Sequence, residues 1–218
     1  MADKALMTDI ESFILIGGAS RRMGSDKARL NLGGRTFVAR IADALSPITN
    51  TISIVGARTE CESFNLPVVE DVYAGWGALG GVHAALRACR TEWAAIVACD
   101  LPFASAELFV RMASMREDFD AVAPLQSDGR PQPLCALYRA QTCVFRAEEL
   151  IEAHERRARA LLRVVATRFV SSDELADLRD APLLFANINT AEDYARALKT
   201  VSNAEVKEEH ITPNELLA

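Results

Sequence analysis

The sequence predicts an α/β fold in which a mostly parallel central sheet carries helices on both faces. Short apolar runs typical of buried strands alternate along the chain with longer segments whose apolar residues recur at helical spacing. Strands and helices that alternate in this way form parallel sheets, because each helix returns the chain to the start of the next strand. A glycine-rich loop follows the first apolar run, at the end of a strand where such sheets bind ligands.

The N-terminal half contains the first four expected strands and two helices. Residues 13–16 are expected to form the first strand, because four apolar residues stand together before a glycine-rich turn. Thr36 can cap a helix over 37–45, which Pro47 closes. Further strands are expected at 52–55, 66–69 and 94–98, the last of them central, and a helix at 79–89.

The C-terminal half continues the alternation. Ser105 can cap a helix that has apolar residues on one face. Strands are expected at 121–123 and 134–138, and helices at 144–154 and 157–165. Asn189 and Thr190 can cap a last helix whose first turn is acidic, which suits the positive end of the helix dipole.

No repeat or linker divides these elements, so a single domain is expected over residues 1–200. Residues 201–218 are polar and acidic and are expected to form a tail, in which 212–215 has the capping pattern of a short helix. The chain has no long apolar run and no signal-peptide pattern, which predicts a cytoplasmic protein without a membrane partner. Five cysteines without C-x-x-C spacing predict buried, reduced thiols rather than a zinc site or disulfides.

The charge distribution points to a small anionic ligand. The net charge is −6, yet residues 21–40 hold six basic side chains and one acidic one. A compact positive segment in an acidic protein favours a polyphosphate ligand and argues against nucleic-acid binding.

The loop that contains Gly17, Gly18, Arg22 and Lys27 has the composition of a phosphate-binding loop. Glycines let backbone N–H groups approach ligand oxygens, and the basic side chains surround them with positive charge. The spacing matches neither a P-loop nor a dinucleotide fingerprint. A surface turn with solvated arginines is the alternative interpretation.

Residues 15–27 resemble the signature of the molybdenum cofactor guanylyltransferases, which build molybdopterin guanine dinucleotide. Their pattern is roughly L-A-G-G-x-S-x-R-M-G-x-D-K, and this chain departs from it at Ile16, where alanine is usual. The resemblance covers residues 12–199 and implies a three-layer, Rossmann-like nucleotidyltransferase fold. It places the guanine at Leu15, Ile16 and Gly17, with Gly18 favouring guanine over cytosine.

Residues 99–102 (Cys-Asp-Leu-Pro) follow the expected central strand directly. A carboxylate there suits Mg²⁺, which binds one or two carboxylates together with substrate phosphates, although Asp100 could also serve only to turn the chain. The family's C-D-x-P motif implies that Asp100 binds the metal. Asp71, at the end of another strand, matches a family position that contacts the nucleotide.

Three further segments carry a resemblance or a departure. Residues 75–81 differ from the family's G-P-L-x-G at Ala78, and Trp76 either packs in a wall or stacks on the base. Residues 55–58 lack an asparagine that many members use for the nucleotide. Residues 187–193 resemble N-x-N-T-P-E-D, which implies that Asn187 reaches the metal or the second substrate, and Arg130 and Gln132 are expected to face the pterin.

The resemblance implies transfer of GMP from GTP to molybdenum-bound molybdopterin, with Mg²⁺ as cofactor and pyrophosphate as product. Molybdoenzymes or their chaperones are candidate partners. The expected catalytic residues are Arg22, Lys27, Asp100 and Asn187, and the expected GTP contacts are Leu15, Ile16, Gly17, Gly18, Lys27, Asp71 and Asp100. The alternatives are a related nucleotidyltransferase that uses CTP or another phosphorylated acceptor, and a non-catalytic guanine-nucleotide-binding scaffold.

Overall fold

The computed structural model describes residues 9–16, 27–49, 51–56, 64–73 and 75–209, with the side chains of Lys27 and of residues 203–209 left out. The strands are β1 (Ile10–Leu15), β2 (Asn31–Leu32), β3 (Arg35–Thr36), β4 (Ile52–Val55), β5 (Val68–Val69), β6 (Trp93–Ala98), β7 (Ala121–Pro124), β8 (Cys135–Arg139) and β9 (Thr167–Val170). The α-helices are α1 (Phe37–Leu45), α3 (Gly77–Ala88), α4 (Ala106–Ala113), α5 (Ala140–Glu152), α6 (Leu161–Val164) and α7 (Ala191–Glu209). Short 3₁₀ helices are η3 (Lys27–Arg29), η5 (Ala158–Ala160), η6 (Asp173–Leu175) and η7 (Ala181–Leu183).

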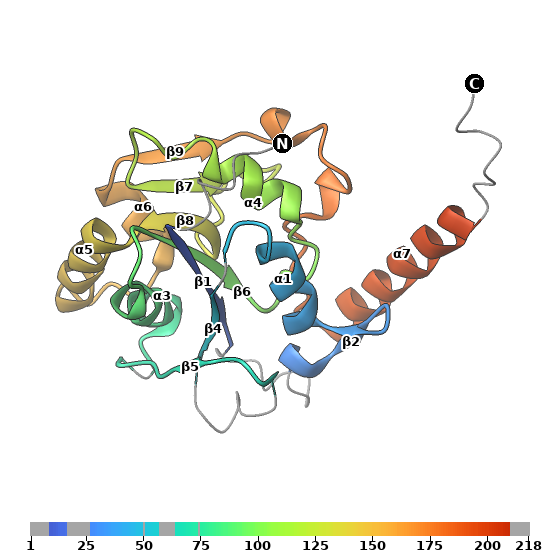
Figure 1. Cartoon of the computed structure of the whole chain (residues 1–218), viewed down its shortest axis with the longest axis horizontal. Coiled ribbons are helices and arrows are strands. Elements are labelled where there is room, and N and C mark those ends of the chain that lie inside the picture. Colours follow the sequence, from blue (N-terminus) through green and yellow to red (C-terminus); the bar gives the residue numbers. More distant parts are fainter. Residues whose placement is uncertain (1–8, 17–26, 50, 57–63, 74, 210–218) are drawn as a thin grey trace.

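Seven of the described strands form one twisted sheet in the order β5-β4-β1-β6-β8-β7-β9 (Figure 1). β1 lies between β4 and β6 and is parallel to both, with Ile14 opposite Ile54 and Val97. β8 alone among these strands runs antiparallel to its neighbours β6 and β7. The predicted mostly parallel α/β sheet is therefore confirmed, with one reversal that the apolar runs did not indicate.

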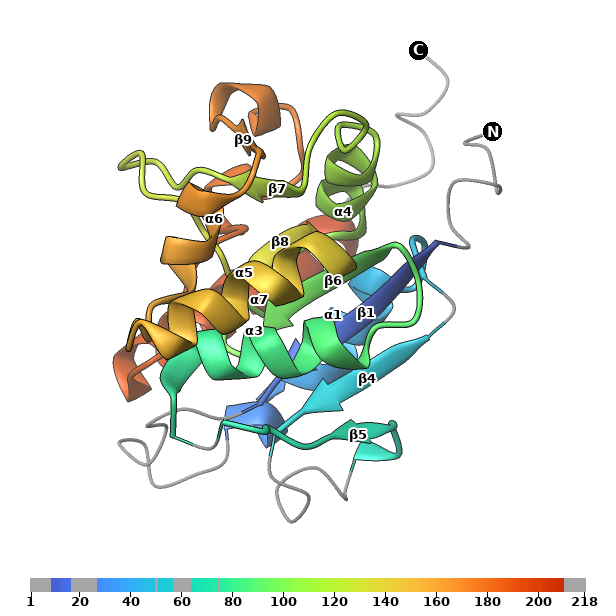
Figure 2. The ribbon, with the colours of Figure 1, turned by 90° about the vertical axis from the view of Figure 1, so that its left-hand side faces the viewer.

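Helices cover both faces of the sheet, as predicted. α1 and α4 pack on one face in a core that includes Ile41 and Phe109, and α3, α5 and α6 pack on the other around Leu79 and Leu161. Figures 1 and 2 show these two layers on opposite sides of the strands. β6 is buried along its whole length, because a strand in the middle of such a sheet is covered on both faces.

Two of the expected helix caps are present with the predicted geometry. The Thr36 hydroxyl accepts a hydrogen bond from the N–H of Ala39 at 3.2 Å, at the start of α1. The Ser105 hydroxyl accepts one from the N–H of Leu108 at 3.2 Å, at the start of α4. Each bond satisfies one of the donors that a helix N-terminus leaves free, and fixes where the helix begins.

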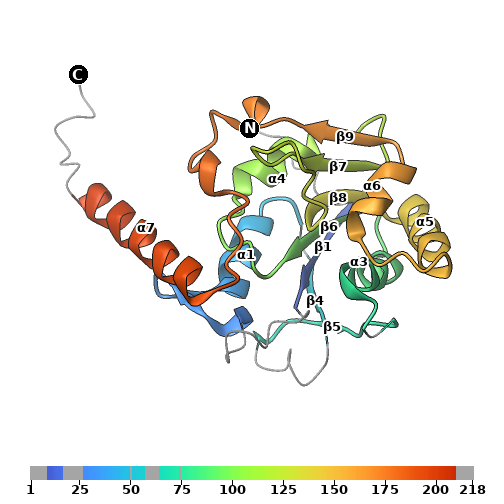
Figure 3. The same cartoon turned by 180° about the vertical axis from the view of Figure 1, so that it is seen from behind.

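α7 begins with a reciprocal cap, and its first turns dock on the body of the protein. The Thr190 hydroxyl accepts from the N–H of Asp193 at 3.1 Å, and the Asp193 carboxylate accepts from the N–H of Thr190 at 2.9 Å. Tyr194 and Ala197 pack against Leu32, and Figure 3 shows the rest of the helix pointing away from the sheet. α7 runs to Glu209, so the first part of the expected tail is helical.

The remaining expectations on the fold meet mixed outcomes. The helix expected at 212–215 lies outside the described residues. β9 and the small β2–β3 hairpin had not been expected. Cys89, Cys99, Cys135 and Cys143 are free thiols, and all but Cys89 are buried, as predicted, whereas Cys61 lies outside the described residues. Within the described part of the chain, none of the helices combines the length and apolar character needed to cross a membrane.

Candidate active site

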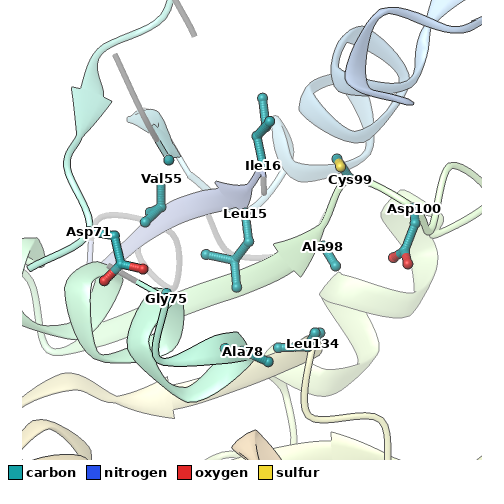
Figure 4. A pocket seen from close by; sticks show the side chains of 13 residues that line it. Leu15, Ile16, Val55, Asp71, Gly75, Ala78, Ala98, Cys99, Asp100 and Leu134 are labelled. Atoms are coloured by element: carbon teal, nitrogen blue, oxygen red, sulfur yellow. The ribbon is translucent and has the colours of Figure 1, made fainter. Parts of the chain in front are cut away.

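A cavity of about 560 Å³ opens at the carboxyl ends of β1, β4 and β6 (Figure 4). The strand ends contribute Leu15, Ile16, Val55, Gly56, Ala98, Cys99 and Asp100, the start of α3 and the segment before it contribute Asp71, Gly75, Gly77, Ala78 and Gly81, and Leu134 completes the lining. This is the edge at which open α/β sheets bind ligands. The cavity brings together Leu15, Ile16, Asp71 and Asp100, four of the residues that the resemblance assigns to the nucleotide.

Asp100 is positioned by a turn that hydrogen bonds fix on both sides. The N–H of Cys99 donates to the carbonyl of Leu15 at 3.0 Å, which extends the β1–β6 ladder to the last residue before Asp100. The N–H of Ile188 donates to the carbonyl of Asp100 itself at 3.0 Å. That second bond brings the segment that contains Asn187 to the same edge, although 87 positions separate Asn187 from Asp100.

Asp71 occupies the other side of the cavity and has a structural bond of its own. Its Oδ1 accepts a hydrogen bond from the N–H of Tyr73 at 2.9 Å, the geometry of an Asx turn. Figure 4 shows the Asp71 and Asp100 carboxylates on opposite sides of Leu15. The cavity therefore has one carboxylate on the α3 side and one beyond β6, with apolar side chains between them.

Close packing at α3 requires glycine next to Asp71. A Cβ placed on Gly80 would stand 3.1 Å from the carbonyl oxygen of Tyr73, 3.1 Å from the Cβ of Trp76 and 3.3 Å from Oδ1 of Asp71. All three distances are shorter than ordinary van der Waals contact. Gly80 is therefore what allows α3 to approach the turn that holds Asp71.

Only some of the backbone groups predicted to recognise the base are free to bind it. The N–H of Ile16 donates to the carbonyl of Val55 at 2.8 Å, because it continues the β1–β4 ladder. A donor to a guanine oxygen would have to come from a residue after Ile16. Gly17, Gly18 and Arg22 lie outside the described residues, and Lys27 is described only by its backbone at the start of η3.

A second cavity of about 620 Å³ adjoins the first and shares Ala78 and Leu134 with it. Its lining includes Arg130, Gln132 and Asn187, which the sequence placed near the second substrate. It also includes three residues that sequence reasoning missed, namely Arg157, Arg159 and Arg163. Their signal was a basic cluster in the expected helix 157–165, but nothing in the sequence relates that helix to residues 130–134.

The arginines of this second cavity differ in their pairing. Arg130 donates to Asp128 at 2.6 Å, and Arg157 forms a two-pronged pair with Glu155 at 2.8 Å. The pKa of Glu155 is lowered to about 2, mainly by the Arg157 guanidinium and to a smaller extent by the backbone N–H groups of Arg157 and Arg156. No carboxylate in the described part of the chain pairs with Arg159 or Arg163. The cavity therefore presents positive charge to a ligand.

A resident metal centre of three or more His, Cys, Asp or Glu side chains is absent from the described residues. Asp100 and the segment of Asn187 bring one carboxylate and one amide to the sheet edge. That donor set fits an ion such as Mg²⁺, whose other ligands are commonly waters and substrate phosphates.

Solved structures share this fold, and two of them show how far the likeness extends. Molybdopterin-guanine dinucleotide biosynthesis protein A from Archaeoglobus fulgidus superposes with a TM-score of 0.75 at 24% sequence identity, over 88% of this chain and 99% of that one. The 4-diphosphocytidyl-2C-methyl-D-erythritol synthase from Anaerococcus prevotii superposes with a TM-score of 0.65 at 15% identity, over 92% of this chain and 100% of that one. At these identities the likeness establishes the fold.

Sequence comparison establishes the family. The family model of the MobA-like NTP transferase domain matches residues 12–175. The probable molybdenum cofactor guanylyltransferase of Pelotomaculum thermopropionicum is 34% identical over 199 residues, which cover 91% of this chain and 96% of that protein. The protein of the same name from Carboxydothermus hydrogenoformans is 32% identical over 203 residues, covering 90% and 98%. Because it shares sequence with this family along nearly all of its length, the chain belongs to the MobA-like NTP transferases and is a nucleotidyltransferase.

Proposed function

We propose that the chain transfers GMP from GTP to molybdenum-bound molybdopterin, forming molybdopterin guanine dinucleotide and releasing pyrophosphate. The observation that carries this proposal is the pair of adjoining cavities that share Ala78 and Leu134. One contains the carboxylates of Asp71 and Asp100, and the other is lined by arginines. A transfer between two bound substrates needs two such sites side by side, and the names of the relatives, each a probable molybdenum cofactor guanylyltransferase, support this choice of substrates.

The nucleotide would occupy the first cavity. Leu15 and Ile16 would flank the guanine, and Gly17 and Gly18 would supply the N–H groups that Ile16 cannot, because its own N–H is bonded to Val55. Asp71 would contact the nucleotide from the α3 side. Arg22 and Lys27 would balance the charge on the β- and γ-phosphates, which leave as pyrophosphate.

Asp100 and the substrate phosphates would hold Mg²⁺, with Asn187 as a further oxygen ligand or a contact to the acceptor. The ion would supply charge neutralisation at the α-phosphate. The attacking oxygen belongs to a phosphate that is already ionised at neutral pH, so the reaction requires no general base. The chain's own contribution is to position the two substrates and to stabilise negative charge, which dominate catalysis of phosphoryl transfer.

The acceptor would occupy the second cavity, with its anionic groups against the arginines. Arg159 and Arg163 are suited to this role because no carboxylate of the described chain neutralises them. Arginine binds phosphate oxygens through two parallel N–H groups, which fixes orientation as well as charge. Arg130 and Gln132 would contact the acceptor from the opposite wall.

The proposal is tested by measuring pyrophosphate release from each of the four nucleoside triphosphates with Mg²⁺, with and without molybdopterin carrying molybdenum. The expected result is release from GTP that depends on the acceptor. Release from CTP alone would instead assign the chain to a cytidylyl reaction. Tight GTP binding without pyrophosphate release under any condition would refute the proposed transfer reaction and favour a non-catalytic nucleotide-binding scaffold.

Variants of each cavity separate the two substrates. Asp100→Asn should lower turnover at least about 100-fold, because a metal ligand contributes several kcal/mol and each 1.4 kcal/mol is a factor of ten. Asp118→Asn, an exposed carboxylate before β7 at the opposite sheet edge, is the matched control. The double variant Arg159→Gln/Arg163→Gln should raise the KM of the acceptor with little effect on GTP binding, whereas Arg87→Gln on the exposed face of α3 should change neither. If Asp100→Asn were as active as the unaltered enzyme, the assignment of the metal to Asp100 would be wrong.

A further inference from the structure

Trp76 immediately precedes α3 and lines neither of the two cavities. Its neighbours Gly75 and Gly77 both line the first cavity, and both have positive φ angles, +79° and +70°. Positive φ is open to glycine at little cost, so this turn can follow a path that other residues would resist. The indole is carried by the turn and is half-buried.

The indole is held by the segment 154–157, which follows α5. Its Nε1–H donates to the carbonyl of Glu155 at 3.0 Å, and the guanidinium carbon of Arg156 lies 4.9 Å from the centre of the ring. The His154 ring lies 6.1 Å away. A guanidinium over an indole face is an attractive cation–π contact. One side chain thus makes both a hydrogen bond and a ring contact to a segment about 80 positions away in the sequence.

Backbone contacts join the same two segments. The N–H of Leu79 donates to the carbonyl of Arg156 at 3.3 Å. A Cβ on Gly77 would lie at an ordinary contact distance of 3.4 Å from that same carbonyl oxygen, so it is the positive φ of Gly77 that favours glycine there. Figure 2 shows α3 and α5 side by side, with the start of α3 and the end of α5 at the same end of the pair.

The segment that receives Trp76 also positions a wall of the second cavity. Glu155 accepts the indole N–H with its carbonyl, and with its carboxylate it binds Arg157, which lines that cavity. On the other side, the N–H of Trp76 donates to the carbonyl of Tyr73 at 2.9 Å, and Tyr73 donates to Asp71 in the first cavity. A continuous path of contacts therefore runs from Asp71 through Trp76 to Arg157.

We infer that Trp76 is a positioning residue that braces the nucleotide cavity against the wall of the acceptor cavity, so that the geometry of each depends on the other. This inference rests on the proposed function in assigning the nucleotide to the first cavity and the acceptor to the second. Trp76 acts through the turn 75–77 and through Glu155 and Arg157, and touches neither substrate. The consequence is that one substitution at Trp76 weakens binding in both cavities.

The test uses the full chain and four variants: Trp76→Phe, Trp76→Leu, Arg156→Leu, and the double variant Trp76→Leu/Arg156→Leu. Phe145→Leu is the matched control, because Phe145 is a 59% exposed aromatic residue on α5 that lines neither cavity. The Kd of GTP with Mg²⁺ is measured by calorimetry without acceptor. The KM of molybdenum-bound molybdopterin and kcat are then measured at saturating GTP.

Trp76→Leu should weaken GTP binding about tenfold, equivalent to about 1.4 kcal/mol, and should raise the acceptor KM by a similar factor. Arg156→Leu should have the same two effects, but smaller. The double variant should bind GTP and the acceptor no more weakly than Trp76→Leu does, because both substitutions break the same contact between Arg156 and the Trp76 ring. Trp76→Phe keeps a ring beneath Arg156 and should restore part of the loss. Phe145→Leu should change neither constant.

A Trp76→Leu protein with a lower Tm but unchanged Kd and KM would overturn the inference, because Trp76 would then only stabilise the fold. Loss confined to GTP binding, or additive losses in the double variant, would also overturn it. If Trp76→Leu does not fold, Trp76→Phe and Arg156→Leu decide the matter in the same assays. If the proposed function is wrong, the unaltered protein will not bind GTP, and this result is distinct from any effect of the variants. The same variants are then titrated with the nucleoside triphosphate that the unaltered protein does bind.

Discussion

Replacing Gly80 with alanine should destabilise the protein, although alanine is the better helix former. Gly80 lies inside α3, where a glycine normally lowers stability by about 1 kcal/mol relative to alanine. Here the added Cβ would stand 3.1 Å from the carbonyl oxygen of Tyr73 and 3.1 Å from the Cβ of Trp76. Neither atom belongs to the far end of a flexible side chain, so the helix or the turn must move to admit the methyl group.

The neighbouring Gly81 provides the matched comparison. Its added Cβ would meet only the methyl groups of Leu15, at 3.6 and 3.8 Å, which is ordinary contact. Gly81→Ala should therefore retain the helix advantage of up to about 1 kcal/mol. Overpacking of a filled site costs about 1–3 kcal/mol, so Gly80→Ala should lose about 1 kcal/mol after the helix advantage is subtracted.

The two variants should differ by about 2 kcal/mol in the free energy of unfolding. For a chain of this length each kcal/mol shifts Tm by about 2–4 °C, so the two midpoints should lie about 4–8 °C apart. Thermal unfolding followed by circular dichroism measures this gap directly. A Gly80→Ala protein as stable as Gly81→Ala would refute the steric argument, and with it the conclusion that α3 is packed tightly against the Asp71 turn.

Three further outcomes are expected. Ser105→Ala should lower the free energy of unfolding by about 1 kcal/mol through loss of the α4 cap, measured by urea denaturation, and an unchanged midpoint would contradict the cap. The N–H of Asn189 and the hydroxyl of Thr190 hold the pKa of Asp193 at about 2, below its unfolded value. The contribution of Asp193 to the free energy of unfolding should therefore be complete above about pH 4 and should be lost as the pH falls toward 2. An acid titration of stability should show this component in the unaltered protein and lack it in Asp193→Asn. Burial raises the pKa of Cys135 and Cys143 to about 12, so neither thiol should react with a thiol reagent at pH 8 until urea unfolds the chain, and rapid labelling of either in the native state would show that it is accessible.

The sequence was sufficient for elements that carry their own boundary signals. Thr36 and Ser105 were recognisable as caps because a short hydroxyl side chain preceded an amphipathic run, and both bonds are present. β9 was missed because its four residues include Arg168 and its pairing with β7 is a tertiary property. Likewise an apolar run shows that β8 is buried but carries no information about its direction.

The residues of the site also differ in whether the sequence alone could place them. Asp100 could be placed from the sequence because a residue that ends a buried strand must lie at the ligand edge. Arg159 and Arg163 could not, since only the folded chain brings η5 and α6 next to residues 130–134. Trp76 had two interpretations, and the structure places it against Glu155 and Arg156 and outside the first cavity's lining, which supports the packing role.

The reversal of β8 has a consequence for how this enzyme could be altered. Because β8 starts at the edge where β6 and β7 end, residues 125–134 form a hairpin connection over the ligand edge, where Gln126 and Arg130 are already joined by a backbone bond of 2.8 Å. A connection anchored between two paired strands can be exchanged for one of another length while those strands stay paired. Under the proposed function, residues 126–133 are the part of this hairpin to graft when a different acceptor is wanted, and Leu134 is to be kept because it also lines the first cavity.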